Sequence, residues 1–269
     1  MNKAALLALL LLALPAFADN VTGFEDYALS VTITANPDGT AHVDEEVQLI
    51  VSQNVFDLYK DSLRSTRLTI ADWQNTTGSK NLRYHILGAN ASPVNTRIFP
   101  KPLQRFQYVD KSIAVITVEY DTSGPIFLAA PAGPRKTNYT FMPQVLSFEN
   151  APEGQVLPEN TVLVMNILPN SVVDLSRTFP RPTSPSAPDS KPSMAATYAW
   201  NATGGAIPLT PFDFGFTTEQ SIDSEVSGFF ASMQAKTTEL LFSNYGLLLV
   251  ILAFVFLALI FVLRQTKTI

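Results

Sequence analysis

Few side chains in this 269-residue sequence could carry acid–base or metal chemistry, because it has no cysteine and only two histidines. The densest acidic group is Asp44-Glu45-Glu46, and Glu119 and Asp121 stand two residues apart farther along. A pair of carboxylates is enough for a glycoside hydrolase, with one as the acid and the other as the base or nucleophile. In a β-strand, Asp44 and Glu46 would share a face about 7 Å apart. We expect a solvated acidic surface here rather than a catalytic pair.

Glu45 differs from its neighbours, because strand alternation directs it toward the apolar face. This placement indicates either an irregular strand or a buried carboxylate that needs a partner. Arg64, Arg67 or Arg83 could provide the partner charge. Both interpretations stay open from the sequence.

The two histidines, His42 and His85, could act as a general base or as a metal pair. An isolated histidine in a strand is more often an ordinary hydrogen-bonded side chain. The sequence contains no Gly-x-Ser-x-Gly elbow, P-loop, Rossmann glycine pattern, HExxH motif or Asp-x-Asp-x-Asp calcium loop. We therefore predict no enzymatic activity, no cofactor and no metal site.

The overall charge excludes one class of partner. Lys and Arg number 18 and Asp and Glu number 23, which gives a net charge of −5. A chain with so few bases has no basic patch to neutralise phosphates, so we expect no nucleic-acid partner.

The N-terminal residues 1–18 are typical of a secretory signal peptide. Lys3 is basic, residues 4–14 are apolar, and Ala16-Phe17-Ala18 is a small-residue cleavage site. We predict cleavage between Ala18 and Asp19.

An apolar segment near the C-terminus predicts a transmembrane helix over residues 244–263. No charged residue occurs in residues 240–263, and roughly 20 helical residues cross a hydrocarbon core of about 30 Å. Arg264 and Lys267 follow the segment and act as a stop-transfer signal. The positive-inside rule then predicts a single-pass protein in the cell membrane, with the N-terminus outside and a cytoplasmic tail of residues 264–269. The lipid bilayer is therefore an expected partner.

Five Asn-x-Ser/Thr sequons predict N-glycosylation of the exported part. Pro93 directly follows one of them and disfavours its use. The five asparagines are Asn20, Asn75, Asn90 (the disfavoured one), Asn138 and Asn201. An exported domain of this size without cysteine indicates a bacterial or archaeal cell envelope.

Residues 19–217 have the pattern of an all-β domain, an antiparallel β-sandwich or two in tandem. Apolar residues alternate over 27–33 and 41–49, and Asn36-Pro37-Asp38-Gly39 between them suits a hairpin turn. No helical segments of 10–15 residues separate the strand candidates, which disfavours a parallel α/β sheet. The further strand candidates are 67–73, 82–88, 104–109, 112–121, 126–130, 137–142, 161–168, 194–201 and 211–217.

Two segments after residue 179 depart from this pattern. Residues 180–192 contain five prolines and predict an extended exposed loop or spacer. The strands that follow are too few for a separate domain, so we expect them to complete the first. Residues 218–243 predict a juxtamembrane helix, with Thr217-x-x-Gln220 as its capping box. Its apolar side would lie on the bilayer, against a partner, or under the β-domain.

Three stretches carry a resemblance: residues 29–51 (LSVTITANPDGTAHVDEEVQLIV), 113–121 (IAVITVEYD) and 156–172 (VLPENTVLVMNILPNSV). Together with the leader and the anchor, they resemble an uncharacterised family of bacterial and archaeal envelope proteins. The resemblance implies an exported β-sandwich that opens with a hairpin whose second strand is acidic. It implies no catalytic residues.

These patterns lead to one main expectation and two alternatives. The main one is a type I surface protein whose β-sandwich is a binding, adhesive or structural module, or a subunit of an envelope complex, with a protein or glycan partner. The first alternative is a membrane-tethered glycan hydrolase that uses its carboxylates. The second is an accessory subunit of a membrane glycosylation, secretion or protease complex.

Overall fold

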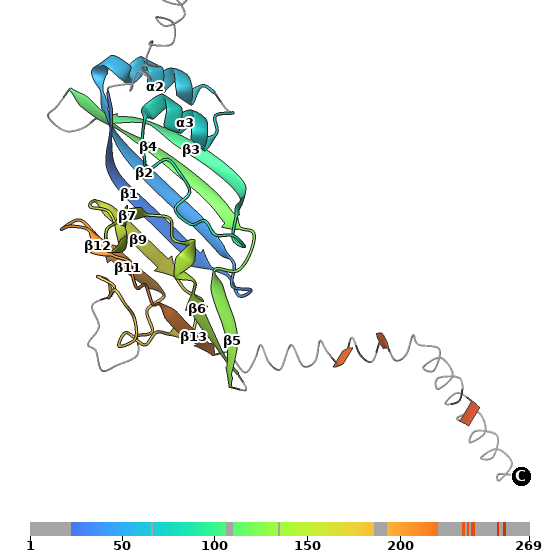
Figure 1. Cartoon of the computed structure of the whole chain (residues 1–269). Helices are drawn as coiled ribbons and strands as arrows, with labels where there is room; N and C mark the ends of the chain where they lie inside the picture. Colours follow the sequence, from blue (N-terminus) through green and yellow to red (C-terminus); the bar gives the residue numbers. More distant parts are fainter. Residues whose placement is uncertain are drawn as a thin grey trace, which may run out of the picture. The chain divides into compact units, whose positions relative to one another are not determined.

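Strands along which buried and more exposed residues alternate build most of the domain, and Figure 1 draws them as arrows. The structure, a computed structural model, describes residues 23–219 except 66, 106–109, 134 and 186–192, together with eight later residues. Those eight are Met233, Gln234, Lys236, Thr238, Glu239, Leu252, Val255 and Phe256. The chain divides after Thr218 into two units, of which the first is mostly β-sheet with two short α-helices among its described residues. The expectation of an all-β domain is therefore confirmed.

The largest sheet has six strands in the order β11-β9-β1-β2-β4-β3. Their bounds are β1 (Phe24–Ala35), β2 (Ala41–Ser52), β3 (Pro93–Arg105), β4 (Lys111–Thr122), β9 (Thr161–Asn166) and β11 (Thr197–Asn201). Buried and partly exposed residues alternate along β2 without interruption. The sheet thus has one face in the core and one face toward solvent.

The opening hairpin forms as its sequence predicts. β1 and β2 pair antiparallel, with Ala35 opposite Ala41. The Asn36 N–H donates to the Thr40 carbonyl (2.9 Å), and Gly39 has a φ of 84°. The Gly39 carbonyl accepts the N–H groups of Ile126 and Phe127, so the turn also contacts the start of β5 (Phe127–Gly133).

One pairing contradicts the antiparallel expectation. β1 pairs with β9 in parallel, with Leu29 opposite Thr161 and Thr34 opposite Asn166. A parallel neighbour needs a long crossover, and here strands β2 to β8 lie between β1 and β9 in the sequence. The first sheet is therefore mixed.

Two smaller sheets complete the unit, one in the order β10-β13-β6-β5 and one in the order β12-β8-β7. Their other strands are β6 (Lys136–Phe141), β7 (Glu149–Ala151), β8 (Gly154–Leu157), β10 (Ser171–Val172), β12 (Ile207–Pro208) and β13 (Gly215–Glu219). β11, β12 and β13 follow the proline-rich segment, yet each pairs with a strand that precedes it. These late strands therefore pair within the sheets of the first unit.

The strand expected over residues 67–73 is wrong. A helix, α3 (Ile70–Thr77), occupies the second half of that range, after α2 (Phe56–Leu63). Thr69 caps α3: its hydroxyl accepts the Asp72 N–H, and the Asp72 side chain accepts the Thr69 N–H. Trp73 then points into the core, 5.6 Å from the ring of Tyr59 in α2. Short 3-10 turns cover Gln53–Val55 and Pro143–Val145.

The strand expected over residues 82–88 is also not regular. This segment contributes only two isolated bridges, Ile86 with Leu146 and Gly88 with Ala91. Side-chain hydrogen bonds instead attach the preceding residues to β1: the Asp26 carboxylate accepts hydrogen bonds from the Ser79 hydroxyl and the Lys80 N–H.

Aromatic side chains fill the core between β11 and β13. Phe212, Phe214 and Phe216 are all buried, as their alternation predicts. Trp200 of β11 lies 5.2 Å from Phe212 and 5.4 Å from Phe214, between ring centroids. Each fully buried aromatic ring removes a large apolar area from water, so this cluster holds the late strands to the earlier ones.

Several predictions lie outside the described residues: the signal peptide, its cleavage site at Ala18 and Asp19, most of the juxtamembrane and transmembrane segments, and the tail with Arg264 and Lys267. Across the residues that are described, no helix is both long and apolar enough to cross a membrane. Thr217 does not cap a helix, because it belongs to β13 and its hydroxyl donates to the Asn138 side chain (2.7 Å).

Candidate functional site

The solvent-facing side of β1, β2, β4 and β3 gathers most of the polar candidates. Residues paired across neighbouring strands point to the same face, and the register aligns them in three rows. The rows are Thr34–His42–Asp121–Val94, Thr32–Asp44–Glu119–Arg97 and Ser30–Glu46–Thr117–Phe99. Four carboxylates thus share one surface. Alternation predicts a common face for Asp44 and Glu46, and the register between β2 and β4 brings Glu119 and Asp121 beside them.

His42 lies between two of these carboxylates. Its Nδ1 is 2.8 Å from Oδ1 of Asp121, and its Nε2 is 3.7 Å from Oδ1 of Asp44. The hydrogen bond to Asp121 raises the pKa of His42 against the opposing effect of its partial burial. Hydrogen bonds from Asn95 and from His42 lower the pKa of Asp121. The two shifts favour a charged His42–Asp121 pair.

Glu46 has a separate cationic partner. Lys101 Nζ lies 2.9 Å from one Glu46 oxygen, and the Gln48 amide donates to the other (3.0 Å). Partial burial acts to raise the pKa of Glu46, but these hydrogen bonds outweigh it and lower the pKa. Glu46 is therefore a fixed anionic group on this face.

Two adjoining hollows run along this face and share Glu119. The first has a volume of about 450 Å³, and the second, next to His42, has a volume of about 390 Å³. In the first, Thr117 Oγ1 is shielded from solvent and has no hydrogen-bond partner among the described residues. We call the two hollows together the polar groove; it is lined by Ser30, Thr32, His42, Asp44, Glu46, Asn95, Thr96, Arg97, Phe99, Lys101, Thr117, Glu119 and Asp121.

Sequence reasoning missed the β3 side of the polar groove. Asn95, Arg97, Phe99 and Lys101 come from β3, whose first eleven residues the strand candidates do not include. Pro93, Pro100 and Pro102 conceal the strand in the sequence. Proline lacks an N–H and is tolerated on an edge strand, and β3 ends the order of its sheet.

On the opposite face, Glu45 is a buried carboxylate. Its side chain is fully buried and accepts the His85 N–H (2.8 Å) and the Tyr120 hydroxyl, with His85 Nδ1 2.7 Å away. Tyr120 in turn accepts the Ile86 N–H (3.2 Å). Burial and the adjacent Glu45 charge raise the pKa of Tyr120. The Glu45–His85–Tyr120 cluster therefore joins β2, β4 and the segment around residue 85.

This cluster settles two sequence hypotheses. Glu45 is buried, but none of Arg64, Arg67 and Arg83 is its partner, and Arg64 pairs instead with Asp61 (3.2 Å). His42 and His85 lie on opposite faces of the sheet and cannot form a metal or catalytic pair together. Within the ranges that the structure describes, no group of three or more His, Cys, Asp or Glu side chains could hold a metal ion.

Four of the five sequon asparagines are described, and all four are exposed: Asn75 on α3, Asn90, Asn138 on β6 and Asn201 on β11. Asn20 lies outside the described residues. Exposure is necessary for N-glycosylation but does not show that it occurs, so glycosylation at these positions stays a prediction.

Comparison with known protein families finds no family that matches this chain, and comparison with curated proteins finds no matching relative.

Proposed function

We propose that this protein is a single-pass surface protein whose β-domain binds a glycan in the polar groove. The sequence of its two ends supports membrane attachment, as argued above. The composition of the polar groove supports the ligand class. We further propose that the six-stranded and four-stranded sheets are the two layers of a β-sandwich, because Trp200 of β11 packs against Phe212 and Phe214, which directly precede β13 of the four-stranded sheet.

The chemistry of the polar groove carries the ligand proposal. Carboxylates and hydroxyls accept and donate hydrogen bonds with sugar hydroxyl groups, and Phe99, which is 44% exposed, offers a flat apolar ring to the C–H face of a sugar. A purely apolar partner would leave these carboxylates desolvated without hydrogen bonds, at a cost.

Binding of the full-length protein to an array of cell-surface glycans tests this proposal. We expect Phe99→Leu to raise the Kd about tenfold, equivalent to about 1.4 kcal/mol. Phe179→Leu is the matched control, because Phe179 is similarly exposed (48%) but does not line the polar groove. Equal affinity of the two variants, or no glycan bound by the wild type, would contradict the proposal.

Membrane attachment is tested separately. We expect the protein to stay with membranes after alkaline carbonate washing, and we expect external protease to degrade the β-domain on intact cells. Release by carbonate would contradict the anchor, and protection from external protease would contradict the orientation.

A glycan hydrolase is the second candidate, because Asp44 and Glu119 stand directly opposite each other in the register of β2 and β4. Retaining glycosidases need two carboxyl groups roughly 5 Å apart. Product release from bound glycans would favour this activity. If the four amide variants (Asp44→Asn, Glu46→Gln, Glu119→Gln, Asp121→Asn) abolish that release, the polar groove is catalytic; with no release by the wild type, the binding module stands.

A further inference from the structure

In the hairpin formed by β5 and β6, β5 leaves the core almost at once, whereas β6 buries Tyr139 and Phe141. Phe127 is buried, but all the following residues of β5 are exposed, on both faces of the strand. Residues 128–133 read Leu-Ala-Ala-Pro-Ala-Gly and contain no polar side chain, and Leu128 is 54% exposed. Exposed apolar segments of this kind mark contact with a partner or a membrane.

The edge of β5 is a poor template for another protein strand. β5 ends the order of its sheet, but Pro131 has no N–H, and the register shifts between Pro131 and Gly133. A proline and a bulge are the features that prevent strands from pairing at a sheet edge. The exposed apolar surface therefore fits a lipid environment better than an added strand.

The register places the end of this hairpin where the chain leaves the domain. The Thr217 hydroxyl donates to Asn138 (2.7 Å) and the Phe141 N–H to the Phe214 carbonyl (2.9 Å), so β6 and β13 run antiparallel. The start of β6 thus lies beside the end of β13. Figure 1 shows β5, β6 and β13 at the end of the domain opposite α2 and α3.

The predicted anchor keeps this end of the domain near the membrane. Residues 220–243 separate β13 from the predicted span, and these 24 residues would extend only about 36 Å in the predicted helical conformation. The hairpin also ends in two bases, Arg135 and Lys136. Long basic side chains place their apolar stems along a bilayer and their charges among anionic headgroups.

We propose that the β5–β6 hairpin lies in the headgroup region of the bilayer and gives the domain a second membrane contact. The partner is a lipid surface with anionic headgroups. This inference rests on the proposed membrane anchor, because the anchor brings the hairpin to the bilayer.

The proposal has a consequence for one sequon. Asn138 is paired with Ala130 in the hairpin register, so the two side chains point to the same face. A glycan on Asn138 would cover the face that contacts lipid. We therefore expect Asn138 to be unmodified, and a mass spectrum that shows a glycan on Asn138 would overturn the proposal.

Because the chain has no cysteine, one introduced cysteine can report on the local environment. The full-length protein with Ala130→Cys is labelled with an environment-sensitive fluorophore and reconstituted into vesicles of phosphatidylcholine with phosphatidylglycerol. The matched control is Ala71→Cys, because Ala71 is an exposed alanine on α3 at the opposite end of the domain. We expect a blue-shifted emission and quenching by lipid-borne quenchers at position 130 and neither at position 71. In phosphatidylcholine alone, we expect a smaller shift.

The outcomes separate this inference from the anchor. A protein that resists carbonate extraction but has an unquenched label at position 130 overturns the hairpin contact and leaves the anchor intact. A blue shift that depends on protein concentration, without quenching from the lipid, indicates pairing between chains and also overturns it. Extraction by carbonate overturns the anchor itself, whatever the label reports.

Discussion

The burial of the Glu45 carboxyl group depends on the hydrogen bonds that its neighbours supply. Glu45 stands in a cross-strand row between Val31 and Val118, and its carboxyl oxygens accept hydrogen bonds from the His85 N–H and the Tyr120 hydroxyl, with His85 Nδ1 2.7 Å away. A buried charge is tolerated when it is paired and hydrogen-bonded. This arrangement orders the otherwise irregular segment around residue 85.

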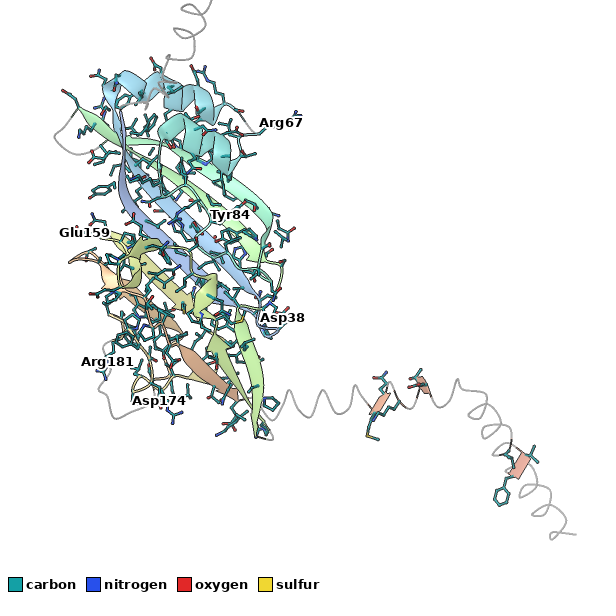
Figure 2. All side chains as sticks on the ribbon, in the orientation of Figure 1. Asp38, Arg67, Tyr84, Glu159, Asp174 and Arg181 are labelled. Atoms are coloured by element: carbon teal, nitrogen blue, oxygen red, sulfur yellow. The ribbon has the colours of Figure 1, made fainter. Side chains whose placement is uncertain are left out.

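Removal of this carboxylate should be strongly destabilising. Glu45→Ala leaves the His85 N–H and the Tyr120 hydroxyl without their acceptor, and breaking a buried pair costs about 3–5 kcal/mol. We expect the thermal midpoint to fall by about 10 °C, measured by fluorescence of the two buried tryptophans. Glu159→Ala is the control, since Glu159 is exposed (Figure 2). A midpoint equal to that of the control would show that the cluster does not stabilise the fold.

The His42–Asp121 pair should make stability depend on pH in a defined direction. The pKa of His42 is raised above 6.5, so its contribution is complete below pH 6.5 and is lost as pH rises through the raised value. The pKa of Asp121 is lowered below 3.8, so its contribution is present above 3.8 and is lost as pH falls through the lowered value. The pair therefore contributes its full stabilisation of the folded state between about pH 3.8 and pH 6.5.

The variant His42→Gln tests this sign. We expect its deficit in thermal midpoint, relative to the wild type, to be largest near pH 5 and to shrink toward about pH 9. Because both side chains are 43% exposed, solvent screening keeps the difference small. A deficit that stays constant over this range would contradict a charged pair.

At the level of elements, the β1–β2 turn connects two strands of the six-stranded sheet and also contacts β5 and β6 of the four-stranded sheet. Gly39 has a positive φ, and a Cβ at this position would lie 2.3 Å from the Phe127 carbonyl oxygen. The Tyr139 hydroxyl of β6 donates to the Pro37 carbonyl in the same turn (2.8 Å). Figure 2 places Asp38 of this turn near β5. A change here disturbs the hairpin and its contact with the second sheet together.

Three glycine variants separate backbone strain from close contact. Gly204→Ala should be nearly neutral, because the new Cβ meets nothing within 4 Å. Gly78→Ala also meets nothing, but its φ of 68° should cost about 1–2 kcal/mol. Gly39→Ala combines a positive φ with the carbonyl contact and should cost about 3 kcal/mol or more. Urea midpoints of the three variants provide the comparison, and any other order would contradict the role of the turn.

Local sequence patterns predict β1, β2 and β4 of the first sheet, but they miss α3 and the partner of Glu45. The period-2 alternation of β1 and β2 gives their faces, and with them the common face of Asp44 and Glu46. Glu119 and Asp121 join that surface through the register between β2 and β4, which the sequence does not show. The helix α3 is missed because its first turn contains a β-branched residue, although Thr69 and Asp72 form a readable cap. The partner of Glu45 is missed because His85 is distant in sequence and lies in residues 82–88, where the expected strand does not form.

At the scale of the whole molecule, the two tryptophans should report a single transition. Trp73 and Trp200 are far apart in sequence, but both belong to one cluster of buried side chains. We expect the fluorescence midpoint of Trp73→Phe to equal its own midpoint by circular dichroism, and the same for Trp200→Phe. Fluorescence midpoints that differ from the circular dichroism midpoint would instead indicate two sandwiches in tandem.

The parallel seam between β1 and β9 has a consequence for biosynthesis. β1 ends at Ala35 and β9 ends at Asn166, so one edge of β1 stays bare while about 130 further residues leave the ribosome. At about 5–20 residues per second, this interval lasts roughly 7–26 s. During this time the unpaired N–H and C=O groups along that edge are open to pairing with another chain.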